Sequence, residues 1–192
     1  MDRVRPFIDV VSPVGSIHVI MGCMYSGKTT EIMRYAHRYQ SIDSNIVLIN
    51  YIDDDRYGED LVYTHDKTGM KGVKARNLYD ISSEELNEAS VVIINEGQFF
   101  SDLYDFCMDM AEKRGKHVLV CGLDGDFERK PFGDMLKLIP VAETVKKLSA
   151  LCAVCKNGTK AHFSKRIVEK KEQVLIGSDD MYIPVCRRHY LE

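Results

Sequence analysis

The sequence lacks three features that would each assign it to a broad class of protein. It has no basic excess, because 26 lysines and arginines stand against 29 aspartates and glutamates, giving a formal net charge of −3. This balance argues against nucleic acid as the main partner. No apolar run has the length of a signal peptide or a membrane span, so we expect a cytoplasmic protein with no membrane partner. No low-complexity tract or internal repeat is visible, and 192 residues suit one medium domain, alone or with a small appendage.

A glycine-bounded loop follows the first strongly apolar stretch. Residues 17–21 run into the segment GCMYSGKTT. The order strand, Gly-x-x-x-x-Gly-Lys-Thr, helix is that of a P-loop, in which backbone N–H groups surround phosphate, the lysine meets the outer phosphates and the threonine is suited to Mg²⁺. A chance turn between strand and helix is the alternative. The residues expected to bind ATP are Gly22, Cys23, Met24, Tyr25, Ser26, Gly27, Lys28, Thr29 and Thr30.

Apolar patterns predict an α/β domain over residues 1–148. Continuous apolar runs are typical of parallel strands buried on both faces, and they occur at 46–51, 91–94 and 117–123. Helical spacing predicts a helix over about 28–40. We therefore expect a mostly parallel sheet with helices on both faces.

The connections between these elements are less regular. We expect a polar loop or hairpin over 52–77. A capping-box pattern at Ser82 predicts a short helix through about Ala89, and Ser101 is suited to cap a further helix that Gly115 ends. A last helix is expected near 141–148.

Two polar residues end the apolar run 91–94. In open α/β sheets such residues face the ligand. Glu96 is suited to take a proton from a substrate hydroxyl, and Asn95 to join a metal shell more weakly because it is neutral. The alternative is that Glu96 is a helix cap or an ion-pairing residue.

The tail, residues 149–192, carries paired soft ligands. Cys152 and Cys155 form a C-x-x-C pair, and thirty residues later Cys186 and His189 form C-x-x-H. Two such pairs can close a tetrahedral zinc site, and four protein ligands indicate a structural ion. A tail of about forty residues cannot bury enough core to stand alone, so a metal staple makes physical sense. Unrelated thiols beside an exposed histidine are the alternative.

The segment 123–133 carries aromatic and basic residues together. Phe127 and Phe132 are suited to wall an apolar slot for a flat base, and Arg129 and Lys130 to meet phosphate or acidic groups. A surface loop with two anchoring aromatics is the alternative.

Together these motifs resemble the thymidine kinase family of the compact cellular and poxviral type. The resemblance covers about residues 14–190 and rests on GCMYSGKTT, DDDRY with the later THD, NEGQFF, LDGDFERKPFG, CAVC, FSKR and VLIGSDDMYIPVCRRH. It implies a P-loop (RecA-like) α/β domain and a small zinc-binding β domain whose long loop, the lasso, closes over the nucleoside. It also implies transfer of the ATP γ-phosphoryl group to the 5′-hydroxyl of deoxythymidine, usually with deoxyuridine accepted, a step of nucleotide salvage for DNA synthesis.

The resemblance also implies roles for individual residues. Glu96 is the general base, and Thr29 and Asn95 are associated with Mg²⁺. The nucleoside pocket is implied to comprise Met24, Phe99, Leu123, Phe127, Phe132, Ser164, Leu175, Ile176, Gly177 and Tyr182. Further polar candidates are Asp54, Asp55, Arg56 and Arg129. Family members are usually homotetramers inhibited by dTTP, so we expect both properties here.

Three positions depart from the family pattern. Asn95 stands where aspartate is common, which weakens the grip on Mg²⁺ or leaves it to Asp54 or Asp55. Ser164 stands where many relatives have threonine, so the hydroxyl is kept and a methyl contact is lost. His189 stands where some relatives have cysteine, and zinc accepts either ligand.

Two other functions are compatible with parts of the sequence. One is a P-loop switch that hydrolyses nucleotide without a nucleoside acceptor. The other is a zinc-ribbon module that binds nucleic acid through Lys156, Lys160, Lys165 and Arg166. The near-neutral composition and the lack of an aromatic and basic stripe argue against the second.

Overall fold

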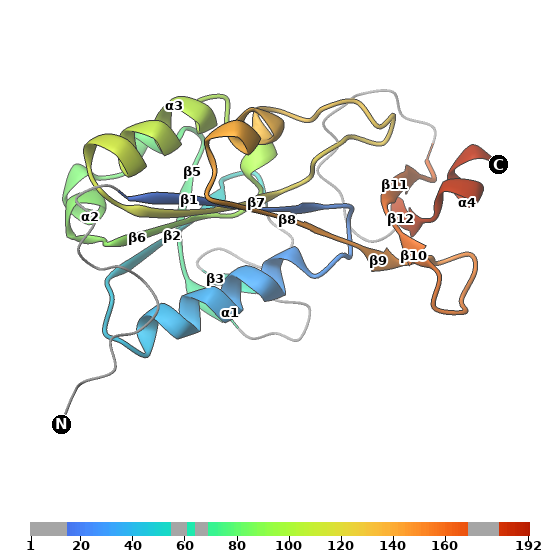
Figure 1. Cartoon of the computed structure of the whole chain (residues 1–192), viewed down its shortest axis with the longest axis horizontal. Helices are drawn as coiled ribbons and strands as arrows, with labels where there is room; N and C mark the ends of the chain where they lie inside the picture. Colours follow the sequence, from blue (N-terminus) through green and yellow to red (C-terminus); the bar gives the residue numbers. More distant parts are fainter. Residues whose placement is uncertain (1–14, 55–60, 64–68, 169–180) are drawn as a thin grey trace.

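A computed structural model describes residues 15–54, 61–63, 69–168 and 181–192. The centre of this part of the chain is a six-stranded parallel sheet in the order β5-β2-β6-β7-β1-β8 (Figure 1). Its strands are β1 (Ser16–Gly22), β2 (Ile46–Tyr51), β5 (Val73–Ala75), β6 (Val91–Ile94), β7 (His117–Gly122) and β8 (Thr144–Leu148). The predicted α/β class and the mostly parallel sheet are confirmed.

The strand β6 shows why the apolar runs fold in this way. Its four residues are valine or isoleucine, and none is more than 1 % exposed. Branched side chains favour extended backbone and fill both faces of a covered sheet. Ile94 pairs with Ile49 of β2 on one side and with Val120 of β7 on the other, so this strand fixes the register of its neighbours.

Helices cover both faces of the sheet. α1 (Lys28–Gln40) lies on the opposite side from α2 (Ser83–Glu88) and α3 (Leu103–Met108) (Figure 1). Alternate residues of β1 serve the two faces: Ile20 belongs to the core under α1, and Val19 to the core under α3. This alternation is the period-two pattern of a strand between two layers.

Short helical turns complete the domain. Asp109–Lys113 continues α3 as a π-helix, and Gly115 follows it with a φ of 62°, as expected for the glycine that ends a helix. Leu78–Asp80, Gly97–Phe99 and Met135–Val141 are 3₁₀ segments. In the described part of the chain, no helix is both long and apolar enough to cross a bilayer.

A small β lobe continues from β8. Its described residues form two antiparallel pairs and a short helix: β9 (Ala150–Leu151) with β10 (Lys160–Ala161), β11 (Phe163–Arg166) with β12 (Tyr182–Val185), and α4 (Arg187–Leu191). Its core includes Cys23 of the loop after β1, together with Ala150, Cys152, Ala161 and Val185. The lobe is therefore packed directly on that loop. We retain residues 1–148 and 149–192 as proposed domains.

The expected helix near 141–148 is wrong. Thr144–Leu148 is the strand β8, which pairs with β1 at the edge of the sheet, and four of its five residues are exposed. Because an edge strand needs no apolar run, the sequence TVKKL carries no buried-strand signal. Backbone pairing with β1 holds the strand, and two ion pairs flank it: Lys146 lies 2.6 Å from Glu31 of α1, and Lys147 lies 2.5 Å from Asp124.

Three smaller expectations also need correction or refinement. The region 52–77 includes β3 (Leu61–Tyr63) and β4 (Gly69–Lys71) as an antiparallel pair, in line with the hairpin, but β5 was not expected. The helix after Ser82 is confirmed, although the serine side chain makes no capping hydrogen bond. The residue that precedes α3 is Asp102 rather than Ser101.

Candidate active site and metal centre

The loop between β1 and α1 has the backbone of a phosphate site. Gly27 directly precedes α1 with a φ of 82°, a conformation that favours glycine. A Cβ at Gly22 would lie 2.5 Å from the carbonyl oxygen of Leu148, so no larger residue fits there. The buried Lys28 folds back and donates from Nζ to the carbonyl of Cys23 at 2.9 Å. Its ammonium is therefore held inside the loop, at the N-terminus of α1, where anions are favoured.

One hydroxyl in this loop has an unmet hydrogen-bonding capacity. Among the described residues, only Ser26 Oγ and Asp102 Oδ1 are buried side-chain atoms without a hydrogen-bond partner. Buried polar groups nearly always have partners, so an unsatisfied hydroxyl within the loop fits a phosphate oxygen as its missing acceptor. Thr29 follows on α1 and is half-buried.

The carboxylate of Glu96 is held at the C-terminal end of β6. Glu96 has a left-handed backbone with a φ of 54° and is 9 % exposed. Such a conformation costs a residue other than glycine on the order of 1–3 kcal/mol and is typical of functional sites. Gln98 donates from Nε2 to Glu96 Oε2 at 2.7 Å and accepts from the backbone N–H of Leu123 at 2.9 Å. The structure thus adds Gln98 as a residue that orients Glu96.

Asn95 belongs to a buried polar chain across three strands. Its Nδ2 donates to Asn50 Oδ1 on β2 at 2.8 Å, and its Oδ1 accepts from the Cys121 thiol on β7 at 3.0 Å. A carbonyl oxygen has two lone pairs, so Oδ1 retains capacity for a second donor or a metal shell. Asn50 was not predicted, because its role depends on the pairing of β2 with β6. Asp54 is buried after β2, whereas Asp55 and Arg56 lie outside the described residues.

The predicted nucleoside residues form two aromatic groups. Phe99 meets Phe132 edge to face, with ring centroids 5.6 Å apart, and Tyr51 packs on Phe99 at 5.2 Å. Phe127 lies under the guanidinium of Arg166 at 3.7 Å, and Arg166 donates to the Tyr182 hydroxyl at 2.5 Å.

The loop and the lobe also meet through single hydrogen bonds. Ser164 Oγ accepts from the backbone N–H of Met24 at 3.0 Å, and the Cys23 thiol donates to the carbonyl of Ala161 at 3.4 Å. Burial raises the pKa of Cys23, so this thiol is a packing group rather than a nucleophile. The lasso positions Leu175, Ile176 and Gly177 lie outside the described residues.

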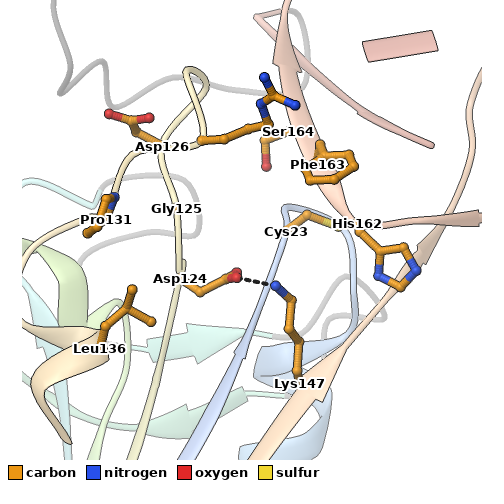
Figure 2. A pocket seen from close by; sticks show the side chains of 11 residues that line it. Cys23, Asp124, Gly125, Asp126, Pro131, Leu136, Lys147, His162, Phe163 and Ser164 are labelled. Carbon is orange, nitrogen blue, oxygen red and sulfur yellow. Dashed lines mark hydrogen bonds and ion pairs between the residues drawn. The ribbon is translucent and has the colours of Figure 1, made fainter. Parts of the chain in front are cut away.

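A cavity of about 190 Å³ opens between the P-loop, the segment after β7 and β11 (Figure 2). Figure 2 shows the ion pair between Asp124 and Lys147 beside it. Its lining includes Cys23, Asp124, Asp126, Arg129, His162 and Ser164. The lobe therefore packs on the P-loop around Cys23 and also encloses a hollow with it.

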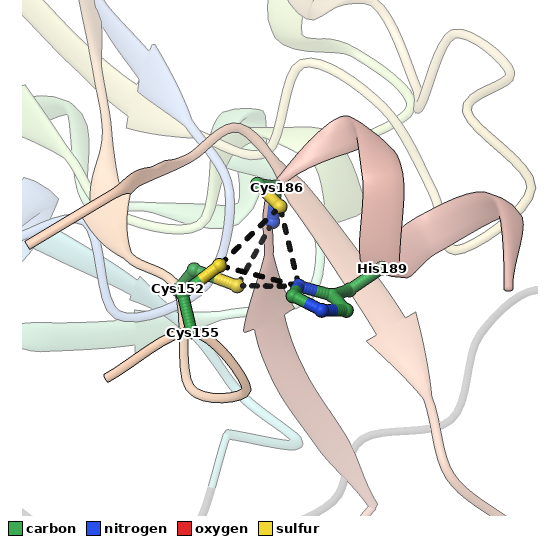
Figure 3. Close-up of side chains that lie close together, drawn as sticks. All are labelled: Cys152, Cys155, Cys186 and His189. Atoms are coloured by element: carbon green, nitrogen blue, oxygen red, sulfur yellow. Dashed lines mark hydrogen bonds between the residues drawn. The ribbon is translucent and has the colours of Figure 1, made fainter. Parts of the chain in front are cut away.

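Four soft ligands converge in the lobe, as the spacing predicted (Figure 3). The donor atoms of Cys152, Cys155, Cys186 and His189 all lie within 4.8 Å of one another, with His189 Nδ1 at 3.5, 3.3 and 3.4 Å from the three sulfurs in that order. Zinc bonds of about 2.3 Å to sulfur and about 2.0 Å to nitrogen give tetrahedral edges of about 3.5 Å between nitrogen and sulfur and about 3.8 Å between two sulfurs. The Cys155 to Cys186 distance of 3.9 Å also agrees. The donor set fits zinc.

The surroundings of the Cys152 thiol favour its ionised form. Burial opposes ionisation of Cys152, but hydrogen bonds from the backbone N–H groups of Cys155 and Cys186 outweigh it, with a contribution from His189, and the pKa falls to about 5. Burial and the neighbouring Cys152 raise the pKa of Cys155. Glu192 lies 3.7 Å from His189 Nε2, on the far side of the ring from the sulfurs, where carboxylates orient metal-binding histidines.

The fold and the sequence of the loop after β1 define a protein of the P-loop α/β class, with a small lobe that carries a Cys₃His cluster fit for zinc. A family model described as thymidine kinase matches residues 15–190. The chain belongs to the thymidine kinase family. The members of this family are ATP-dependent deoxynucleoside kinases.

Curated relatives agree with this assignment. The thymidine kinase of Vaccinia virus (strain Western Reserve) is 46 % identical over 178 residues, covering 93 % of this chain and 98 % of its own length. That of Variola virus is 45 % identical over 178 residues with the same coverage. The thymidine kinase of Oryza sativa subsp. japonica is 43 % identical over 183 residues, covering 93 % of this chain and 67 % of its own.

The alternative nucleic-acid module is not favoured by the contacts of its basic residues. Lys165 donates to the carbonyl of His189 at 2.8 Å, and Arg166 is stacked on Phe127. Two of the four expected contact residues thus serve the packing of the lobe.

Proposed function

We propose that this chain transfers the γ-phosphoryl group of ATP to the 5′-hydroxyl of deoxythymidine, and also of deoxyuridine, with Glu96 as general base. The observation that carries the proposal is the family match over residues 15–190, which spans the P-loop, Glu96, both aromatic groups and the zinc ligands. The loop after β1 and the fixed Glu96 carboxylate after β6, at the same edge of the parallel sheet, support it independently.

In the first part of the mechanism, residues 22–30 hold the triphosphate. The backbone N–H groups and the Lys28 ammonium meet the phosphates, and Ser26 gains the acceptor that its hydroxyl lacks. Thr29 and Asn95 would hold the shell of Mg²⁺, which supplies charge neutralisation at the phosphates when it is bound. Their hydroxyl and amide oxygens are the hard donors that this ion prefers.

In the second part, Glu96 accepts the proton of the 5′-hydroxyl as that oxygen attacks the γ-phosphorus. The new O–P bond forms while the bond from the γ-phosphorus to the β–γ bridging oxygen breaks, and ADP leaves with that electron pair. Gln98 keeps the carboxylate oriented throughout. Positioning and charge neutralisation lower most of the barrier in such reactions.

The acceptor base lies between the two aromatic groups in this proposal. Phe99 and Phe132 wall one side, Phe127 and Tyr182 the other, and Met24 and Leu123 complete the pocket. Ser164 acts through Met24, since its hydroxyl already accepts from that backbone N–H. Leu175, Ile176 and Gly177 of the lasso are proposed to cover the base.

Three further properties are proposed from the family resemblance. The chain forms a homotetramer, and the exposed outer edge of β8 offers one surface for it. The end product dTTP is a feedback inhibitor. A cytoplasmic location is proposed as well, because a cluster of cysteines at metal-ligand spacing is more typical of a reducing compartment than of a secreted protein.

An acceptor panel tests the function. The purified chain is incubated with ATP and Mg²⁺ and, separately, with deoxythymidine, deoxyuridine, deoxycytidine, deoxyadenosine and deoxyguanosine, and monophosphates are separated by chromatography. We expect product with the first two only. Release of phosphate at the same rate without any nucleoside would identify a nucleotide-hydrolysing switch instead.

A further inference from the structure

A tyrosine beside the metal cluster reaches the aromatic wall of the proposed nucleoside pocket. The helix α4 begins after Cys186 and carries His189, and the next residue is Tyr190. The Tyr190 hydroxyl donates to the backbone carbonyl of Phe127 at 2.7 Å. One hydrogen bond thus joins the metal-binding helix to a segment 63 residues away in the sequence.

The segment that receives this bond is a closed, self-bonded turn. Gly125 and Pro131 form a β-bridge, and the backbone N–H of Asp126 donates to the carbonyl of Lys130 at 2.9 Å. The Asp126 carboxylate also accepts from the backbone N–H groups of Glu128 and Lys130, at 2.9 Å each. Because these internal hydrogen bonds hold the turn in one shape, fixing the position of the Phe127 carbonyl also fixes the turn that carries the Phe127 ring.

Contacts with two neighbouring side chains hold the Tyr190 ring in place. The Arg129 guanidinium lies 4.3 Å from the centroid of the Tyr190 ring, and the Phe163 ring lies 5.4 Å from it on the lobe side. Tyr190 is thus packed between the turn and β11, and its hydroxyl has a defined direction. On the other side, Arg166 stacks on the Phe127 ring at 3.7 Å.

We propose that Tyr190 is a positioning residue for nucleoside recognition. It transmits the geometry of the metal-binding helix to the Phe127 wall and so sets the affinity for the nucleoside, without touching substrate itself. This inference rests on the proposed placement of the base against Phe127. The competing explanation is that Tyr190 only stabilises the lobe.

Tyr190→Phe removes the hydroxyl and keeps the ring contacts with Arg129 and Phe163. The loss of one such hydrogen bond changes a binding equilibrium by about threefold to tenfold. We expect KM for deoxythymidine to rise by that factor, with KM for ATP, kcat, zinc content and Tm unchanged. Tyr79→Phe is the matched control, because Tyr79 is half exposed and lies outside the site, and it should leave every one of these values unchanged.

A double-mutant cycle with Phe127→Leu separates the possible failures. If Tyr190 acts through the wall, the effect of Tyr190→Phe on KM shrinks towards onefold in the Phe127→Leu background. An unchanged KM in Tyr190→Phe, or a parallel fall in zinc content and Tm, overturns the positioning role. If Phe127→Leu alone leaves KM for deoxythymidine unchanged, the proposed pocket is what fails, and the inference falls with it.

Discussion

Removal of one proposed metal ligand gives the sharpest test of whether zinc stabilises the lobe. The lobe has a small hydrophobic core: among the described residues, none of its five buried members is larger than valine and they include Cys23 of the P-loop, with half-buried side chains such as Phe163, Ile183 and Tyr190 packed against them. Burying a valine side chain contributes about 1.5–3 kcal/mol, whereas structural zinc contributes about 10 kcal/mol or more in small domains at neutral pH. In the proposed zinc-bound state, we therefore expect metal binding to stabilise the lobe more than any one of these buried side chains does.

We expect Cys152→Ser to lose zinc and thymidine phosphorylation together, while ATP binding and the far-ultraviolet circular dichroism of the central sheet persist. Metal analysis, activity and thermal unfolding are measured on the same sample. Cys107→Ala is the matched control, because it removes a fully buried thiol of α3 outside the lobe and should keep its zinc. Wild-type protein that contains no zinc, or a zinc-free variant of full activity, would refute the reasoning.

Two further predictions concern the sheet domain. Burial lowers the pKa of both His18 and His117, so the unfolded chain binds more protons below a pH of about 6.5, and stability should fall as the pH drops below that value. The urea midpoint should therefore change more between pH 7.5 and pH 5.5 for the wild type than for the double variant His18→Gln/His117→Asn. An equal change in both proteins would exclude these histidines as the cause of the pH dependence. Separately, Gln98→Leu should lower kcat about tenfold by releasing Glu96, with KM for ATP unchanged; a normal kcat in steady-state assays would remove the orienting role.

The loop after β1, the strand β6 and the metal cluster could be predicted because each depends on residues that are close together in the sequence. The glycines and Lys28 fix the loop after β1 through their own backbone and charge, and a run of four branched residues is enough to specify β6. The metal cluster was predictable for a similar reason, because paired ligands at short spacing constrain one another. These features depend on residues close together in the sequence.

The features that were missed depend on tertiary contacts. The edge strand β8 is exposed and pairs with β1 on one side only, so its sequence pattern does not separate it from a helix. Gln98 and Asn50 gain their roles only when β2, β6 and β7 stand side by side. Tyr190 bonds to Phe127, which is 63 residues away in the sequence, and the spacing of apolar residues does not predict a contact of this kind.

Replacement of the proposed base tests the central claim most directly. In Glu96→Gln, Gln98 can still donate to the amide oxygen, so the geometry is kept while the proton acceptor is lost. Single-turnover phosphorylation of deoxythymidine is measured beside equilibrium binding of the nucleoside, with the exposed Glu112→Gln as control. The account predicts a rate lower by about 10²–10⁴ with binding almost unchanged. A near-normal rate in Glu96→Gln would contradict it.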